Sequence, residues 1–368
     1  MKYSSALGLA LTLFAAPSAV AQVGGDAGGG TSSDGGTVTG AGADASGGGS
    51  GGLSGGPAGS QGGGSVGDFQ VQGSSGVYSI LPDSTRAGSY VAVADENVFA
   101  AMAVVSLSYV ATAMVFVLDR HTGKLLVDHS VIGPGAAASF EDQGDGRRKA
   151  EFKWGRTCLS LADNGCVVDL GGARTPTHIV TRPRSLARAT PIAAVVPIEG
   201  GYANATEKRL SEVSAEIIAD GHRFLLDRAL AAYDHTAGFL ARHTAWRWAL
   251  GMGFAKSGER IAFNLVEGFV GEAECGGWVG DELFGLGEGR FDFDTERPSE
   301  PWQVRTTCGA IDLTFHPQAI HAEDKDMWLV RSKFIQPIGS FEGRVVLGGK
   351  RFEVARLAGV TEHQDVLW

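Results

Sequence analysis

Three adjacent residues, Trp246-Arg247-Trp248, carry the side chains of this sequence that are best suited to hold a small molecule. Residues of a β-strand point alternately to its two faces, so in a strand over 244–250 both tryptophans share one face. Arg247 lies on the other face between Ala245 and Ala249, which leave space beside it. We therefore expect the arginine to orient an anionic or carbonyl group of a ligand, and the tryptophans to form walls.

The next strand, residues 261–269, is expected to pair with the first one across the turn Lys256-Ser257-Gly258. The pairing predicts Asn264 and Val266 on the arginine face. It predicts Phe263 and Leu265 on the tryptophan face. A buried arginine without a partner is costly, and Glu274 and Glu362 are the candidates to pair with it. A structural salt bridge in a barrel interior is the alternative explanation of the same pattern.

Proton transfer could be carried by five acidic or imidazole side chains: Asp234, His235, Glu274, Glu362 and His363. Burial beside aromatic rings raises the pKa of a carboxyl, which can then act as an acid near neutral pH. Trp278 would add a third aromatic wall. Each residue also has a structural alternative, since an aspartate can cap a turn, a histidine can be satisfied within a barrel, and a polar pair near the C-terminus can be solvated. The tryptophans can equally belong to the core.

Several function classes lack support in the sequence. The formal net charge is −10, and a nucleic-acid-binding protein would show a basic stripe instead. No C-x-x-C or H-E-x-x-H spacing occurs, so a zinc site has no support and we expect no metal. We also expect no cofactor, because ATP and reduced nicotinamide are scarce outside the cytoplasm, where this chain is expected to act. Gly63-Gly-Ser-Val-Gly67 matches a nucleophile elbow only by chance, because glycine-rich sequence surrounds it. Cys158 and Cys166 flank a turn at unequal distances and should not face each other, whereas a Cys275–Cys308 disulfide stays possible.

Glycine turns divide the chain after residue 75 into hairpins, because such turns favour positive φ angles and are flanked here by runs rich in Val, Ile, Phe and Trp. The turns are Thr122-Gly123, Asn164-Gly165, Asp220-Gly221 and Gly348-Gly349. Residues 99–118 are uncharged and long enough for a membrane helix, but their β-branched and small side chains favour two consecutive buried strands. The pattern predicts an all-β fold of antiparallel hairpins in a large sandwich or barrel arrangement.

The N-terminal part has a different character. Residues 1–21 combine a positive start, an apolar stretch and a small-residue cleavage site, which is typical of a signal peptide. Glycine makes up 22 of the 53 residues from 23 to 75, so residues 22–75 are expected to be a disordered linker. The β domain is then residues 76–368, with sub-domains of about 76–205 and 206–368. We expect an exported protein, periplasmic, secreted or at the cell surface, with no transmembrane segment after signal removal.

The chain also resembles a known family, the domain of unknown function DUF2804. The resemblance is carried by motifs that occur in order: Asp234-His-Thr-x-Gly238, Leu240-x-Arg242-x-Thr-x-Trp-Arg-Trp-Ala249, Phe263-Asn-Leu-Val-x-Gly-Phe269 and Gly359-Val-Thr-Glu-His-x-Asp-x-x-Trp368. It covers essentially the whole β domain. Arg242 joins the expected ligand-binding residues because it belongs to the second motif. Cys275 departs from the pattern, in which asparagine follows the glutamate.

The pattern is similar, more remotely, to carotenoid hydratases and related cyclases. That similarity implies two lipocalin-like barrels or sandwiches in tandem, which hold an apolar small molecule. Two functions follow: a cofactor-independent acid–base enzyme of the hydratase, cyclase or isomerase kind, or a non-catalytic lipocalin-like carrier of a lipid or pigment, whose ligand carboxylate Arg247 would bind. Clustering of Asp234, Glu274 and Glu362 in one pocket with Arg247 would favour the enzyme. Scattered salt bridges would favour the carrier. The sequence indicates no protein partner.

Overall fold

The computed structural model describes residues 70–73, 76–79, 86–142, 148–171, 176–184, 189–198, 202–326 and 331–367. All of them lie in one of the chain's two units, residues 62–368. The predicted signal peptide and most of the predicted linker lie outside the described residues. Within the range predicted as linker, Gln70–Gly73 forms strand β1 and pairs with β2 (Gly76–Ser79). The run Gln-Val-Gln contains no glycine and can therefore extend as a strand.

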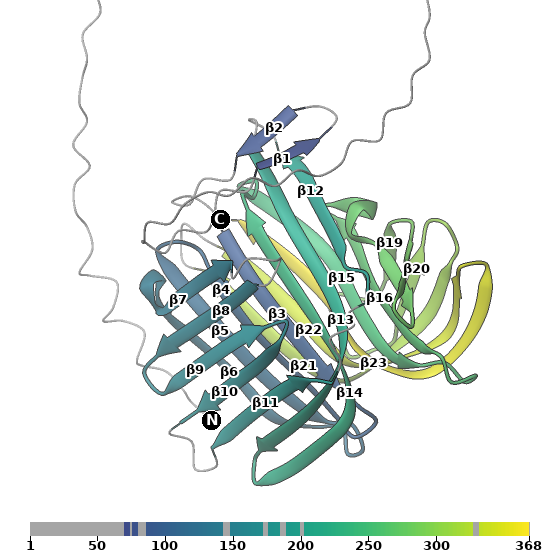
Figure 1. The fold of residues 1–368 in the computed structure, drawn as a ribbon, viewed down its shortest axis with the longest axis horizontal. Coiled ribbons are helices and arrows are strands. Elements are labelled where there is room, and N and C mark those ends of the chain that lie inside the picture. Colours follow the sequence, from purple (N-terminus) through teal and green to yellow (C-terminus); the bar gives the residue numbers. More distant parts are fainter. Residues whose placement is uncertain are drawn as a thin grey trace, which may run out of the picture. The chain divides into compact units, whose positions relative to one another are not determined.

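The first large sheet is twelve-stranded and antiparallel (Figure 1). Its spatial order is β6 (Lys124–Pro134), β5 (Val110–Asp119), β4 (Val98–Ser106), β3 (Arg86–Ala94), β14 (His222–Gly238), β13 (Tyr202–Ala219), β11 (Thr177–Pro183), β10 (Gly165–Leu170), β9 (Thr157–Ala162), β8 (Arg148–Trp154) and β7 (Ala138–Asp142). β12 (Ile192–Ile198) pairs with β13 off this path, and a short 3₁₀ turn, η2 (Gly135–Ala137), precedes β7. The sheet curls until β7, β8 and β9 pack over β3, β4 and β5, which makes it a nearly closed barrel.

The second large sheet is nine-stranded, antiparallel and forms a half-barrel. Its spatial order is β18 (Glu282–Gly285), β17 (Gly276–Val279), β16 (Arg260–Gly268), β15 (His243–Phe254), β23 (Lys350–Leu367), β22 (Arg331–Leu347), β21 (Ile311–Asp326), β20 (Trp302–Thr306) and β19 (Gly289–Asp292). A 3₁₀ turn, η3 (Gly271–Glu274), joins β16 to β17. The all-β, tandem-barrel prediction is confirmed.

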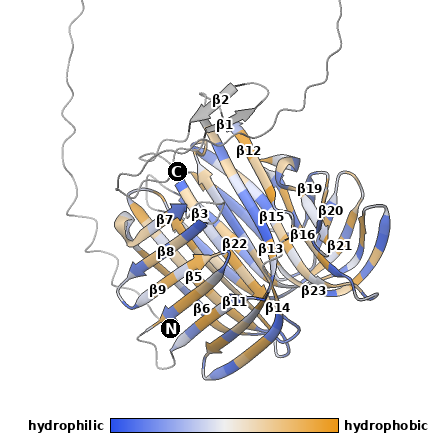
Figure 2. Ribbon diagram, viewed as in Figure 1, coloured by the Kyte–Doolittle hydropathy of each residue, from blue (hydrophilic) through white to orange (hydrophobic). Residues whose placement is uncertain are grey.

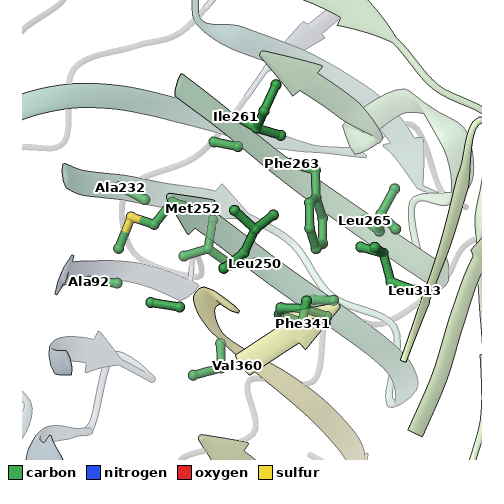
Figure 3. Close-up of a cluster of buried hydrophobic side chains, with 14 of the residues drawn as sticks. Ala92, Ala232, Leu250, Met252, Ile261, Phe263, Leu265, Leu313, Phe341 and Val360 are labelled. Atoms are coloured by element: carbon green, nitrogen blue, oxygen red, sulfur yellow. The ribbon is translucent and has the colours of Figure 1, made fainter. Parts of the chain in front are cut away.

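Strand alternation gives the molecule two hydrophobic cores, and hydrophobic and hydrophilic residues alternate along many strands (Figure 2). Val93 and its neighbours of that face fill the interior of the first sheet. Ala92, one residue earlier, belongs to a second core that the first sheet shares with the second sheet. Figure 3 shows this shared core, in which Ala92 and Ala232 of the first sheet lie near Met252 of the second. The two sheets therefore pack against each other, and that contact is where the site forms.

The predicted hairpins are confirmed at all four turns, where Gly123, Gly165, Gly221 and the pair Gly348-Gly349 have positive φ. Residues 99–118 contain most of β4 and most of β5, two consecutive strands as predicted. The change of sheet, however, falls between Gly238 and His243 rather than near residue 205. The reason is that β13 and β14 form one long hairpin, and β14 completes the first sheet by pairing with β3.

The four cysteines carry free thiols. Cys166 lies opposite Leu161 and Cys158 lies opposite Asp169, so the two cysteines do not face each other, as predicted. The Sγ of Cys275 accepts a hydrogen bond from the amide of Val266 at 3.2 Å, which occupies the thiol within the shared core. Within the ranges that the structure describes, no helix is long and apolar enough to cross a membrane.

Candidate acid–base site between the sheets

Lys208 is a buried lysine held by two carboxylates at the contact between the sheets. It lies on β13 directly opposite Asp234 of β14, and its Nζ is 2.5 Å from Asp234 Oδ2. Glu274, at the end of η3, approaches from the second sheet with Oε2 at 3.0 Å from the same Nζ. Burial alone would lower the pKa of Lys208, but attraction to both carboxylates outweighs burial and raises it. Lys208 therefore remains a cation at neutral pH.

Glu362 supplies a third carboxyl, from β23. Its Oε1 accepts a hydrogen bond from Trp246 Nε1 at 2.7 Å, and its Oε2 accepts one from Gln336 Nε2 at 2.7 Å. Burial raises the pKa of Glu362 to about 7, although both hydrogen bonds act in the opposite direction. This carboxyl can therefore gain or lose a proton near neutral pH.

The three carboxyls face a single cation. Burial also raises the pKa of Glu274, and the charge of Asp234 adds to that shift while Lys208 opposes it. The charge of Asp234 likewise raises the pKa of Glu362. Burial and the nearby negative charge of Asp234 therefore favour the protonated forms of Glu274 and Glu362 relative to a free carboxyl.

Tyr90 places a phenol in the same cluster. It lies on β3 opposite Asp234, and its ring meets Trp248 edge-to-face with centroids 5.3 Å apart. Its hydroxyl is buried and has no hydrogen-bond partner among the described residues. Burial, followed by the charges of Glu362 and Asp234, raises the pKa of Tyr90. The hydroxyl thus stays protonated and available to a ligand.

A chain of hydrogen bonds fixes Glu274 in place. Trp248 Nε1 donates to Asn264 Oδ1 at 2.7 Å, and Asn264 Nδ2 donates to the backbone carbonyl of Glu274 at 2.7 Å. Trp278 donates from Nε1 to the carbonyl of Thr190, also at 2.7 Å, and lines the small cavity beside Lys208. Seven of the residues singled out from the sequence therefore gather here: Asp234, Trp246, Trp248, Asn264, Glu274, Trp278 and Glu362.

Arg247 is not part of this cluster, and its predicted partners were wrong. Its Nη1 is 3.0 Å from Glu267 Oε2, and its guanidinium lies 5.8 Å from the centre of the Phe293 ring. The predicted faces were wrong as well, because Trp248 lies opposite Val266, while Phe263 lies opposite Gly251 on the arginine face. Asn264 therefore lies on the tryptophan face. The physical reason is the turn, which is closed by the hydrogen bond from Ala255 N to Glu259 O, so that even-numbered residues oppose even-numbered ones.

Three further candidates point elsewhere. His235 follows Asp234 and faces the interior of the first sheet, where its Nδ1 is 2.9 Å from Ser89 Oγ. His363 follows Glu362 and faces Phe293, with ring centroids 5.7 Å apart. Arg242 is exposed in the connection between β14 and β15. Adjacent strand residues point to opposite faces, so Asp234 and His235, and likewise Glu362 and His363, cannot share one site.

The comparison with protein families identifies the chain. The model of the domain of unknown function DUF2804 matches residues 85–368. This protein belongs to the DUF2804 family. No curated protein matches the sequence.

Several solved structures are similar to this DUF2804 protein. The crystal structure of CghA matches with a TM-score of 0.45 and 8% identity, over 77% of this chain and 88% of that chain. Kievitone hydratase from Nectria haematococca matches with a TM-score of 0.42 and 11% identity, over 76% and 88%. CghA with Sch210972 matches with a TM-score of 0.42 and 8% identity, over 77% and 88%. At these scores the likenesses assign no activity to the DUF2804 protein.

Sequence reasoning missed three members of the cluster: Lys208, Tyr90 and Gln336. Lys208 stands between Thr206 and Leu210 on one face of its strand, and Leu210 belongs to the core. The sequence signal for Lys208 was a charged residue on a strand face that continues into apolar residues. Gln336 begins Gln336-Pro-x-Gly-x-Phe-x-Gly343, a further motif that carries the resemblance to DUF2804. No local pattern distinguishes Tyr90 from a core aromatic residue.

The cavity at the cluster is small. Its volume is about 10 Å³, which is room for about one water molecule, and Lys208, Asp234, Trp248, Asn264 and Trp278 are among its lining residues. A larger open cavity, of about 800 Å³, is lined by Ala273 and Cys275 on either side of Glu274 and by Ile192 of β12. No group of three or more His, Cys, Asp and Glu side chains in the described ranges is arranged to hold a metal ion.

Proposed function

We propose that this DUF2804 protein is an enzyme that moves protons to and from a small, partly apolar molecule held between its two sheets. Glu362 is the proton donor, because a pKa of about 7 lets it hold a proton at neutral pH and release it to a substrate. Asp234 is the acceptor of a proton from the substrate. Lys208 remains charged and stabilises negative charge that develops on a substrate oxygen.

The observation that carries the proposal is the gathering of three carboxyls in one cluster with Lys208: Glu274 and Glu362 are buried, and Asp234 is partly buried. A structural salt bridge needs matched charges, whereas an excess of carboxyls shares protons, as acid–base sites do. The carrier alternative relied on Arg247 to bind a ligand carboxylate. Arg247 is paired with Glu267 on another face, so the carrier loses its expected ligand contact, and the enzyme proposal rests on the clustered carboxyls without Arg247.

The chemistry open to such a cluster is hydration, isomerisation or cyclisation at a double bond close to a polar group. Side chains supply both the proton donor and the acceptor, so the proposed reaction is cofactor-independent. Because the cavity holds about one water, neighbouring side chains such as Trp248 must move aside when the substrate binds. The proposal includes export of the protein, on the strength of residues 1–21.

The test is replacement of Glu362 by glutamine, which keeps the size of the side chain but removes its acidic proton. We expect proton transfer to slow by roughly 10²–10⁴-fold. The full chain is incubated with an apolar metabolite extract in heavy water, and mass spectrometry measures deuterium gained at carbon. In the wild type the rate should fall as pH rises above about 7, because Glu362 then loses the proton that it donates.

The matched control is Glu267→Gln, which removes a carboxylate on the other face of the second sheet and should keep the wild-type rate. Deuterium incorporation by Glu362→Gln at the wild-type rate, with an unchanged pH profile, would refute the assignment of the acid.

A further inference from the structure

Asn204 of β13 is a buried amide without partners. The residue is 1% exposed, and neither Oδ1 nor Nδ2 has a hydrogen-bond partner among the residues that the structure describes. Buried side-chain amides are nearly always hydrogen-bonded, because leaving donor and acceptor unpaired costs free energy. The amide of Asn204 is therefore free to bond to a ligand.

The strand pairing places Asn204 on the same face as Lys208. Asn204, Thr206 and Lys208 alternate along β13, and the pairing with β14 shows no register shift until Val213. Val196, directly opposite Asn204 on β12, packs against the core shared by the two sheets. The amide of Asn204 therefore faces the second sheet, as Lys208 does. Lys208 is four positions further along the strand, a distance of about 13 Å.

The backbone beside Asn204 leaves room for its amide. Gly238 lies directly opposite it on β14, and a Cβ at this glycine would stand 3.1 Å from Asn204 Oδ1 and 2.4 Å from the carbonyl oxygen of Ala203. Between Asn204 and Lys208, Thr206 and Thr236 bond to each other with 3.2 Å between their hydroxyls. The threonine pair therefore does not need the amide of Asn204 as a partner, and the amide is a separate polar group on this face.

The acid–base end of the face also has unpaired polar atoms. The hydroxyl of Tyr90 and the Oε1 of Gln336 lack partners in the described part of the chain, and Gln336 already binds Glu362 through its Nε2. Isolated waters could satisfy these groups one at a time. One elongated ligand with a polar group at each end would satisfy both ends of the face at once.

We propose that Asn204 is a substrate-binding residue, whose amide hydrogen-bonds a polar group about 13 Å from the substrate atom that meets Lys208 and Glu362. The inference rests on the proposed function of that cluster and adds the class of substrate. A side-chain amide offers one donor and one acceptor side by side, which matches a carboxamide or an un-ionised carboxylic acid. The substrate is accordingly an elongated, largely apolar molecule with such a group at its far end.

The test measures binding rather than turnover. The probes are linear ω-hydroxy carboxamides of increasing chain length, and quenching of tryptophan fluorescence reports binding to the full chain, since Trp246 and Trp248 line the site. The wild type should bind one chain length best. Asn204→Leu should weaken binding of that probe by about tenfold and abolish the length preference. Linear alcohols of the same lengths, which lack the amide, should bind both proteins equally.

Thermal unfolding separates this role from a structural one. Because the amide of Asn204 makes no bonds within the described protein, Asn204→Leu should keep or raise the melting temperature. Asn264→Leu is the matched comparison and should lower it, since both polar atoms of Asn264 are bonded at 2.7 Å. A melting temperature lowered by Asn204→Leu as much as by Asn264→Leu overturns the proposal, as does the failure of all carboxamide probes to bind or their equal binding to both proteins.

Failure of the two proposals can be told apart. Carboxamide binding that depends on Asn204, without any deuterium transfer, would refute the enzyme and leave the binding site standing. Deuterium transfer that depends on Glu362, with carboxamide binding unaffected by Asn204→Leu, would refute only the binding site.

Discussion

Replacing Lys208 with methionine is expected to lower the free energy of unfolding by about 3–5 kcal/mol, because it leaves the buried carboxylate of Glu274 and the partly buried carboxylate of Asp234 without their cation. Asp234 and Glu274 lie 2.5 and 3.0 Å from Nζ, and the lysine side chain is only 7% exposed, so water cannot take over its role. Activity should be lost along with stability. Chemical denaturation of the wild type and the variant at pH 7 measures the effect.

Two further variants make the prediction specific. Lys124→Met removes a lysine whose partner, Asp220, is solvent-exposed, and it should change stability little. Asp234→Asn combined with Glu274→Gln in the Lys208→Met background should restore much of the loss, because no unpaired charge is left. A Lys208→Met protein as stable as the wild type would show that the cluster is not held by charge.

His235 is expected to make the fold sensitive to acid. Burial above all, and then the charges of Arg148 and Lys208, lower the pKa of His235 to about 3, from 6.5 for an ordinary histidine. Between these values the unfolded chain binds a proton that the folded protein excludes. The contribution of neutral, buried His235 to the free energy of unfolding is thus fully present above pH 6.5 and is lost as the pH falls toward 3. The complete loss is roughly 4–5 kcal/mol.

His235→Gln can still hydrogen-bond Ser89 but does not titrate, so its unfolding free energy should fall less between pH 7 and pH 4 than that of the wild type. Denaturant titrations at the two pH values measure this difference. His222→Gln, at an exposed position of the β13–β14 hairpin, is the control and should follow the wild type. Parallel pH dependence of the wild type and His235→Gln would contradict a neutral, buried His235.

The hairpins could be predicted because their determinants are local. Asp220-Gly221 provides the positive φ angles of its turn whatever the rest of the chain does, and the same holds for Gly348-Gly349. Seven of the ten cluster members named above were also singled out from the sequence, because acidic, amide and tryptophan side chains are the types that proton transfer and ligand binding use. The faces of β15 and β16 were the local error, because a shift of one residue in register exchanges the two faces of a strand.

The centre of the site could not be predicted, because it is made by contact between two sheets. Lys208 becomes part of a charge cluster only when Glu274 of the other sheet approaches it. The residues next to Lys208 in the sequence do not specify that approach. The change of sheet after Gly238 also depends on the pairing of β14 with β3, which are far apart in sequence. Long-range pairing of this kind is decided by the packing of the whole domain rather than by local propensity.

The division of the site between the two sheets has a consequence for exchange of segments between relatives. The first sheet contributes Lys208 and Asp234, while the second contributes Glu274 and Glu362, which have no cation of their own within the cluster. A chimera that joined the first sheet of one relative to the second sheet of another could preserve both apolar cores and still bring together charges that do not match. Such an exchange therefore has to move Lys208 and Glu274 together, although the connection between β14 and β15 separates them in the sequence.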